Sequence, residues 1–382
     1  MLYNDVCGER LSALGLGMMR LPCTDEKMLV IDEAKTCEMI DFAIENGVNY
    51  FDNAWIYHGG NSERIAGKYL RRHKREDFKL ATKFPGMLPE AIGNARGIFE
   101  TQMEKCACGF FDFYLLHNVN ENNIEYYLDD EKYHIVSYFR EQQKKGLIRH
   151  LGFSCHSSPE TLARFLERYG DIMEFGQLQL NYLDWHLQEA CEKAALLDKY
   201  NIPVWIMEPL RGGRLANPPE EMKSCLKSVR PGTGYVELAF RFLQSLPNVK
   251  MVLSGMGNME QLKENIRIFS ENRALTEKEF SQLLKIADGY TAQMGVPCTG
   301  CRYCVEKCPQ KLDIPKLLTQ YNEQKVSNGS WIARMVIGKL PENERPGACI
   351  GCRGCEKVCP QKIRISEVLK SFAAELAPPV SD

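Results

Sequence analysis

The sequence predicts a (β/α)8 barrel, the TIM barrel fold, followed by a small, mainly helical, cysteine-rich domain. Two observations predict this division. Between residues 10 and 270, short apolar runs alternate eight times with longer amphipathic stretches, and eight strands that are each followed by a helix are typical of such a barrel. Beyond residue 297, eight of the sixteen cysteines fall in two matching runs. A chain of 382 residues is long enough for one large domain and one small one.

Each predicted strand is a short apolar run, and each predicted helix has apolar residues at helical spacing. In the first helix, Met39, Ile40, Ala43 and Ile44 share one face before Gly47 ends it. The strands are expected at Ala13–Leu16, Val48–Phe51, Phe78–Thr82, Phe111–Leu116, Ile148–Phe153, Gly176–Leu180, Val204–Met207 and Val249–Leu253. The helices are expected at Asp32–Asn46, Ser62–Arg72, Ala91–Cys108, Lys132–Lys145, Pro159–Arg168, Trp185–Tyr200, Tyr235–Ser245 and Met259–Phe269.

A doubly wound α/β sheet is the alternative fold for this pattern. It is less favoured because no Gly-rich dinucleotide-binding fingerprint follows the first strand. We expect the barrel at residues 1–275, a connecting helix at 276–296, the cysteine-rich domain at 297–372 and a tail at 373–382.

The ends of the connecting segment can also be predicted. Thr276 stands three residues before Glu279, which is a capping pair at the start of a helix that runs to Met294. Within the cysteine-rich domain, the long segment between the two runs contains the helical pattern Ile314–Gln324, so we expect that domain to be mainly helical.

The composition is that of an ordinary soluble globule, with 44% apolar and 26% charged residues. A formal net charge of -2 gives no indication of nucleic acid binding. No apolar run approaches the ~20 residues of a membrane-spanning helix. The chain opens on Met1 without a basic and apolar leader pattern, so we expect a cytoplasmic protein with reduced thiols. The oligomeric state stays open.

The cysteine runs indicate metal clusters. Zinc sites usually separate their ligands into pairs and often include histidine, but no histidine lies beyond His186, and a disulfide framework would require an oxidising compartment. The runs are Cys298-x-x-Cys301-x-x-Cys304-x-x-x-Cys308-Pro309 and Cys349-x-x-Cys352-x-x-Cys355-x-x-x-Cys359-Pro360. The segment resembles a two-cluster bacterial-type ferredoxin. The resemblance implies two [4Fe-4S] clusters, one bound by Cys298, Cys301, Cys304 and Cys359 and the other by Cys349, Cys352, Cys355 and Cys308.

Four polar residues stand at or just after predicted strand ends in the barrel. They are Asp52, Tyr57, Lys83 and His117, and the chemistry of a (β/α)8 barrel lies at the carboxyl ends of its strands. The sequence segments around them are Phe51-Asp52-Asn53-Ala54-Trp55-Ile56-Tyr57, Asn61-Ser62-Glu63, Ala81-Thr82-Lys83 and Leu115-Leu116-His117. Over most of residues 10–270 the sequence resembles the aldo-keto reductases, whose catalytic tetrad is an Asp, a Tyr, a Lys and a His.

The residue types suit the reduction of a carbonyl. Its oxygen gains negative charge and must be protonated, and a phenol of pKa about 10 is a poor acid at neutral pH unless its surroundings assist. We expect Lys83 to lower the pKa of Tyr57 and Asp52 to keep Lys83 charged. We expect His117 to donate a hydrogen bond to the same oxygen.

The resemblance also implies a nicotinamide cofactor held by the second half of the barrel. The positions it implies are Ser154, Gln177, Asn181, Leu210, Arg211, Gly212, Ser254, Gln261, Glu264 and Asn265. The sequence departs from the family pattern at Cys155, Met207 and Glu208, and Lys263 is the only cation between Ser254 and Asn265. The choice among NAD, NADP and a flavin therefore stays open.

The two halves carry electrons in different ways. Hydride transfer moves two electrons at once, whereas an iron-sulfur cluster passes one. We predict an oxidoreductase in which the clusters relay electrons to or from the barrel, with a flavin or the substrate as the converter. The alternatives are an NAD(P)H-dependent carbonyl reductase with structural clusters and a redox-sensing binding protein without turnover. Residues 297–372 have a formal charge of +6, from thirteen Lys or Arg and seven Asp or Glu. This charge suits an acidic ferredoxin or flavodoxin as electron donor, and the alternative is local charge compensation, since the anionic clusters offset part of it.

Overall fold

The protein is described here by a computed structural model. It covers residues 1–25, 27–296, 298, 302, 304–329, 331–359 and 361–377. The chain forms two compact units, Met1–Leu283 and Leu284–Asp382. Their boundary falls inside helix α13 (Glu277–Met294). Within the covered residues, no helix is long and apolar enough to span a bilayer.

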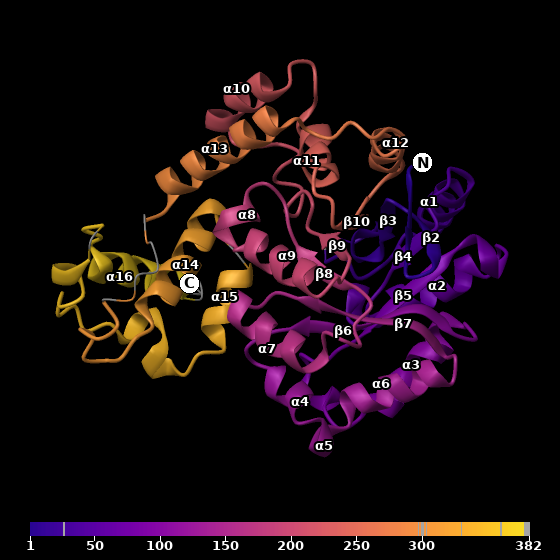
Figure 1. Cartoon of the computed structure of the whole chain (residues 1–382), viewed down its shortest axis with the longest axis horizontal. Coiled ribbons are helices and arrows are strands. Elements are labelled where there is room, and N and C mark those ends of the chain that lie inside the picture. The colour runs from indigo at the N-terminus through magenta and orange to yellow at the C-terminus, as the bar shows by residue number, and fades with distance from the viewer. Residues whose placement is uncertain are drawn as a thin grey trace. The chain divides into compact units, whose positions relative to one another are not determined.

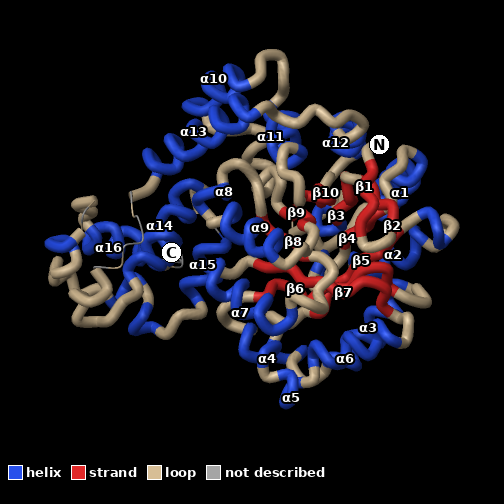
Figure 2. Tube along the Cα trace, viewed as in Figure 1, coloured by secondary structure: helices blue, strands red, loops and turns tan. Residues whose placement is uncertain are grey.

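The first unit is a closed barrel of parallel strands, drawn in red in Figure 2, in the order β10-β3-β4-β5-β6-β7-β8-β9. The strands are β3 (Leu14–Gly17), β4 (Tyr50–Asp52), β5 (Lys79–Phe84), β6 (Phe111–Val119), β7 (Ile148–Cys155), β8 (Gly176–Gln179), β9 (Val204–Met207) and β10 (Val249–Ser254). All eight predicted strands are confirmed, with ends that shift by at most three residues. Because Gly17 pairs with Asp52 and Asp52 pairs with Ala81, the carboxyl ends of neighbouring strands meet at one edge.

Helices surround these strands (Figure 1). The predicted helices correspond to α1 (Glu33–Glu45), α2 (Ser62–Leu70), α3 (Ala95–Cys106), α6 (Ile135–Lys144), α7 (Pro159–Tyr169), α9 (Ala190–Lys199), α11 (Tyr235–Gln244) and α12 (Met259–Ile268). The sequence did not predict α4 (Ile124–Leu128), α5 (Asp130–Tyr133), α8 (Asp184–Leu187) and α10 (Glu220–Val229) as separate helices. The continuous helix expected at Trp185–Tyr200 is wrong, because Glu189 has a left-handed φ of 51° and separates α8 from α9.

A β-hairpin precedes the barrel. Strands β1 (Tyr3–Val6) and β2 (Glu9–Ser12) pair antiparallel around the two-residue turn Cys7-Gly8, whose φ angles are 54° and 71°. Cys7 and Val6 pack against the apolar cluster inside the barrel. The buried members of that cluster are Leu11, Tyr50, Ala81, Phe113, Leu115, Phe175, Trp205, Met251 and Leu253. The hairpin turn therefore lies beside the amino-terminal part of the barrel core, away from the strand ends that carry the tetrad.

The second unit is mainly helical, as expected. Its later helices are α14 (Ile314–Val326), α15 (Trp331–Gly338) and α16 (Ile365–Leu376), and its described residues contain no strand. The core consists of Leu312, Ile314, Leu317, Leu318, Ala333, Ile337, Ile363, Ile365, Leu369 and Phe372, together with Cys304 and Cys355. Two cysteines of the predicted clusters are thus part of this small core.

Described residues at matching positions of the two cysteine runs share a backbone conformation. Arg302 and Arg353 have left-handed φ angles of 65° and 58°, and Lys311 and Lys362 have left-handed φ angles of 55° and 53°. Each pair is separated by 51 positions, and so are the starts of the helices that follow the runs, α14 and α16. The second unit is therefore built from two copies of a cysteine loop followed by a helix.

Candidate active site

The tetrad predicted from the sequence meets at the carboxyl edge of the barrel. Asp52 is the last residue of β4, Lys83 is the second-last residue of β5, and His117 lies near the end of β6. Tyr57 begins the short helical turn Tyr57–Gly60 that follows β4. The parallel register brings these strand ends together, because Lys83 pairs with Leu115 on the neighbouring strand.

Lys83 is the centre of the site. Its Nζ lies 2.6 Å from Asp52 Oδ2, 2.7 Å from the carbonyl oxygen of Asn53 and 3.3 Å from the Tyr57 hydroxyl oxygen. An ammonium has three protons to donate, so each of its donors has an acceptor here. Lys83 is fully buried and Asp52 is 3% exposed. A buried charge of this kind is stable only when it is paired and hydrogen-bonded.

Burial governs the pKa values of this group. Burial alone would lower the pKa of Lys83, but Asp52 and Tyr57 together raise it, so the ammonium stays charged. Burial raises the pKa of Tyr57, the Lys83 ammonium acts to lower it, and the net direction is upward. Lys83 therefore acts in the expected direction on the pKa of Tyr57, but the loss of solvation outweighs the ammonium and the net shift is upward.

His117 is a neutral imidazole in this site. Burial lowers its pKa well below the usual range, and Lys83 and His156 act in the same direction. Its ring meets that of Tyr57 edge to face, with centroids 6.2 Å apart. Its buried Nδ1 has no hydrogen-bond partner within the described structure. A ring nitrogen without a partner beside the phenol is available for a ligand atom.

A buried polar network supports Lys83 from behind. Gln102 Nε2 donates to the Lys83 carbonyl oxygen at 3.0 Å and to Glu63 Oε1 at 2.7 Å, and Gln102 Oε1 accepts from Tyr114 at 2.6 Å. Glu63 also accepts a hydrogen bond from Thr82. The backbone on which Lys83 stands is therefore fixed by side chains from α2, α3 and β6.

The predicted cofactor residues differ in whether their polar atoms already have partners within the fold. Gln177 is 2% exposed, and its Oε1 has no hydrogen-bond partner among the described atoms. This buried acceptor is therefore available to a ligand that donates a hydrogen bond. Ser154 accepts from the Asn118 backbone, and Ser254 accepts from Asn265. Gln261 accepts from the Gly257 backbone, and Glu264 is exposed.

Asn181 and Arg211 are engaged in a buried network of the fold. Asn181 Nδ2 lies 2.6 Å from Asp184 Oδ2 and 3.0 Å from the Glu208 carbonyl oxygen. Arg211 Nε donates to Asp184 Oδ1 at 2.9 Å. The same loop contains Leu210 and Gly212, and Gly212 has a left-handed φ of 65°.

Sequence reasoning missed Asp184 and Arg20. Asp184 is the first residue of the short helix α8. Acidic residues are common in the first turn of a helix, so no signal in the sequence distinguishes it. Arg20 stands three residues after the end of β3. Its side chain packs closely against Gly255, because a β-carbon added to that glycine would lie 2.7 Å from Arg20 Cγ. Burial raises the pKa of the Glu208 carboxyl, and the charge of Arg20 opposes that shift. The strand-end criterion that selected Asp52 also applies to Arg20.

The cluster cysteines occupy the second unit as follows. Cys308, Cys349, Cys352 and Cys355 line one cavity, so the fourth cysteine of the first run lies with the first three of the second. Cys304 is buried, and Cys298 and Cys359 pack against the same core. Cys301 lies outside the described residues.

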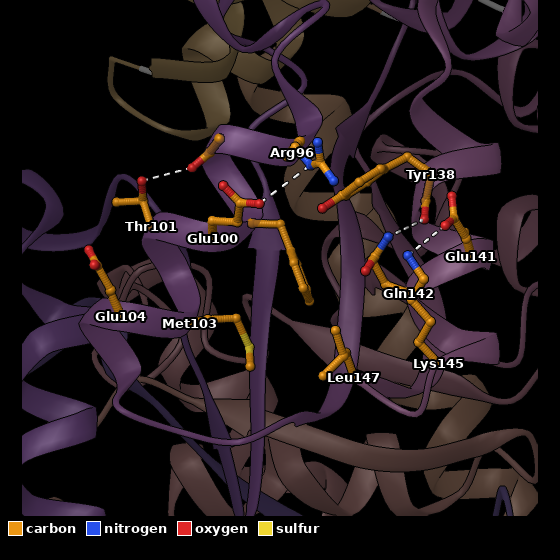
Figure 3. Close-up of a pocket in the computed structure, with 12 residues that line it drawn as sticks. Arg96, Glu100, Thr101, Met103, Glu104, Tyr138, Glu141, Gln142, Lys145 and Leu147 are labelled. Atoms are coloured by element: carbon orange, nitrogen blue, oxygen red, sulfur yellow. Dashed lines mark hydrogen bonds and ion pairs between the residues drawn. The ribbon is translucent and has the colours of Figure 1, made fainter.

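An open hollow of 960 Å³ lies elsewhere on the barrel, between α3 and α6 (Figure 3). Charged side chains on its rim pair along their own helices, Arg96 with Glu100 and Lys145 with Glu141. None of the predicted site residues lines it.

Comparison with known proteins identifies the family of the barrel. The model of the aldo/keto reductase family matches residues 13–288, which is most of the chain. The chain belongs to the aldo/keto reductase family. It is an oxidoreductase, and it carries a second match, to the 4Fe-4S dicluster domain, at residues 297–363.

Relatives of this aldo/keto reductase match its barrel. The uncharacterized oxidoreductase YqkF of Bacillus subtilis is 26% identical over 306 residues, covering 72% of this chain and 92% of that protein. L-galactose dehydrogenase of Arabidopsis thaliana is 22% identical over 289 residues, covering 70% and 87%. Among solved structures, the aldo-keto reductase AKR11C1 from Bacillus halodurans has a TM-score of 0.62 at 22% identity, covering 75% of this chain and 96% of its own. That likeness shows the shared fold.

Proposed function

We propose that this aldo/keto reductase reduces a carbonyl, or a related polarised group of a small molecule, with Tyr57 as the proton donor. The single observation that carries the proposal is the position of Lys83 Nζ, 2.6 Å from Asp52 and 3.3 Å from the Tyr57 hydroxyl. A fixed positive charge beside the phenol stabilises the phenolate that remains after proton transfer.

Each tetrad residue has a distinct role in this proposal. Tyr57 donates its hydroxyl proton to the oxygen of the substrate as negative charge develops there. Lys83 donates to the resulting phenolate, and Asp52 keeps Lys83 charged in a dry site. His117, neutral and with an unpartnered Nδ1, orients the substrate oxygen by a hydrogen bond.

We propose a redox cofactor, NAD(P)H or a flavin, at the same edge of the barrel. When bound, such a group supplies the reducing equivalents. Gln177 fits it, because a buried acceptor without a partner suits a carboxamide or ring N–H. Ser154, Ser254, Gln261, Glu264 and Asn265 would lie along it. Asn181 and Arg211 would support it indirectly, because both are bonded to Asp184, while Leu210 and Gly212 shape the loop.

We propose two [4Fe-4S] clusters as a one-electron relay between the barrel and an external donor. One is bound by Cys349, Cys352, Cys355 and Cys308, and the shared cavity of these four supports that set. By the same pattern, we propose that the other is bound by Cys298, Cys301, Cys304 and Cys359, which the 51-residue repeat supports. Iron-sulfur clusters of this type are bound by four thiolates each.

The proposed donor is an acidic ferredoxin or flavodoxin. Residues 297–372 have a formal charge of +6, and Ile350, next to Cys349, is 63% exposed. The cluster thiolates offset part of this charge. A net basic segment with an exposed apolar residue beside a cluster suits transient docking of an acidic carrier. We place the protein in the cytoplasm, because eight thiolates must stay reduced to bind iron.

The test is donor-dependent turnover by the full chain, purified without oxygen, with a panel of small carbonyl compounds. Reduced viologen and NAD(P)H serve as alternative donors. The Tyr57→Phe variant is expected to lose on the order of 100-fold or more of kcat with either donor. The Tyr126→Phe variant, which changes a tyrosine in α4, is the matched control and should keep full activity.

A cluster variant separates the relay from the barrel chemistry. Cys355→Ser should abolish viologen-driven turnover. Full viologen-driven turnover in that variant would exclude the relay, and full activity in Tyr57→Phe would exclude the proposed proton donor.

A further inference from the structure

Three metal-ligating side chains meet in the barrel unit, away from the tetrad. They are Cys7, His150 and Glu174, and one ligand atom from each lies within 4.8 Å of the others. Cys7 comes from the hairpin turn, His150 from the start of β7 and Glu174 from the segment before β8. These residues are far apart in the sequence, so only the closed barrel with its hairpin brings them together.

The three side chains are already oriented toward one another. His150 Nδ1 lies 2.6 Å from Glu174 Oε2, and Cys7 Sγ lies 3.4 Å from the Glu174 carbonyl oxygen. The His150 ring packs on that of Phe113, with centroids 4.9 Å apart, which fixes the plane of the imidazole. All three residues are partly buried. Thiolates, imidazoles and carboxylates are all zinc ligands, and a site with three protein ligands leaves a fourth position for water.

The charges around the thiol favour a cation. The Glu174 carboxylate lies within 4.8 Å of the Cys7 thiol, and Glu9 follows Cys7 in the same hairpin. Glu9 is paired with Lys79 at 2.6 Å and with Arg149 at 3.5 Å. Glu174 is bonded to His150, to the backbone N–H of Leu151 and to Gln143. The thiol therefore stands beside a carboxylate that has no lysine or arginine partner in the described structure.

The turn itself is unusual for a cysteine. Cys7 and Gly8 both have positive φ, and they join paired residues Val6 and Glu9. A two-residue turn of this type strongly prefers Asn, Asp or Gly at its first position. A residue with a β-carbon is sterically disfavoured in this conformation unless its side chain bonds locally. A bound ion would offset that cost.

We propose that Cys7, His150 and Glu174 bind one zinc ion that ties the hairpin turn to the amino-terminal side of strands β7 and β8. On binding, the Cys7 S–H bond is replaced by an S–Zn bond and the thiol proton passes to solvent. The proton on His150 Nδ1 moves to Nε2 as Nδ1 binds the ion. No electron is transferred, and the ion links the hairpin turn to the barrel strands.

The experiment measures zinc in the full chain with its iron-sulfur clusters in place, after equilibration with zinc and removal of excess. Metal analysis should give about one zinc per chain in the wild type and less than about a tenth of that in Cys7→Asn and His150→Gln. Asn suits the turn, so Cys7→Asn should fold normally and separates metal binding from folding. Cys225→Ser, which changes an exposed cysteine, is the matched control and should keep its zinc.

X-ray absorption at the zinc edge identifies the ligands. The proposal predicts one sulfur at about 2.3 Å and nitrogen or oxygen ligands at about 2.0–2.2 Å. A shell of four sulfurs would place the zinc in the cluster loops and overturn the proposal. Wild-type protein without zinc, or a Cys7→Asn variant that keeps it, would overturn the proposal as well.

Discussion

Lys83 Nζ donates to Asp52 Oδ2 at 2.6 Å in a site where Lys83 is fully buried. The pair joins the ends of neighbouring strands β4 and β5, so the barrel sets its geometry. Because the remaining donors of Lys83 reach Asn53 and Tyr57, the charge on the lysine and the position of the phenol depend on one another.

The Asp52→Asn variant tests this dependence. It leaves a buried lysine without its counter-charge, so the pKa of Lys83 should fall and the free energy of unfolding should drop by about 3 kcal/mol. Turnover should fall at least tenfold. Chemical denaturation and initial rates measure the two effects. Asp171→Asn, which removes an exposed carboxylate, should change neither quantity.

The Gln102→Leu variant tests the network behind Lys83. It removes the donor to the Lys83 carbonyl oxygen and leaves Glu63 and the Tyr114 hydroxyl short of partners. The expected loss is about 1–3 kcal/mol of stability, because a buried polar group without a partner keeps its desolvation cost. Denaturation curves measure it. Gln142→Leu, in α6, is the comparison variant, and an equal loss there would argue against a special role for the network.

His156 predicts a pH dependence of stability. Burial lowers its pKa from 6.5 to about 4. Because the unfolded chain binds a proton at higher pH than the folded one, stability is lost as the pH falls from about 6.5 and levels off near pH 4. The ring keeps some solvent contact, so roughly 3 kcal/mol is an upper bound. Melting of the barrel, followed between pH 7 and 4.5, should show this loss in the wild type and a smaller one in His156→Gln.

Cluster variants test the exchange of the fourth cysteine between the runs. Because Cys308 shares a cavity with Cys349, Cys352 and Cys355, Cys308→Ser should damage the cluster of the second run. Paramagnetic resonance spectra of the reduced protein should match those of Cys349→Ser. Spectra that match Cys304→Ser instead would show that each run binds its own cluster.

The barrel strands and most helices could be predicted from the sequence, because their apolar patterns are local. The hairpin could not, because β1 and β2 have few apolar residues and Cys7-Gly8 is an uncommon turn. The break between α8 and α9 depends on the left-handed conformation of Glu189. The spacing of the apolar residues continues across it, so the sequence pattern does not predict the break.

The tetrad could be predicted for a similar reason, since strand ends are visible in the sequence. The net shift of the Tyr57 pKa could not, because it depends on burial by distant segments. The pairing of Arg211 with Asp184 joins two segments that follow different strands. The two residues are far apart in the sequence, so their contact could not be predicted from it.

The most direct test of the central claim is a double-mutant cycle between Lys83 and Tyr57, measured as kcat with an identified substrate. If the ammonium acts through the phenol, Lys83→Met and Tyr57→Phe should each lower kcat on the order of 100-fold, and the double variant should be no worse than the more damaged single variant. Losses that multiply to about 10,000-fold would show that the two residues act independently, which would contradict the account.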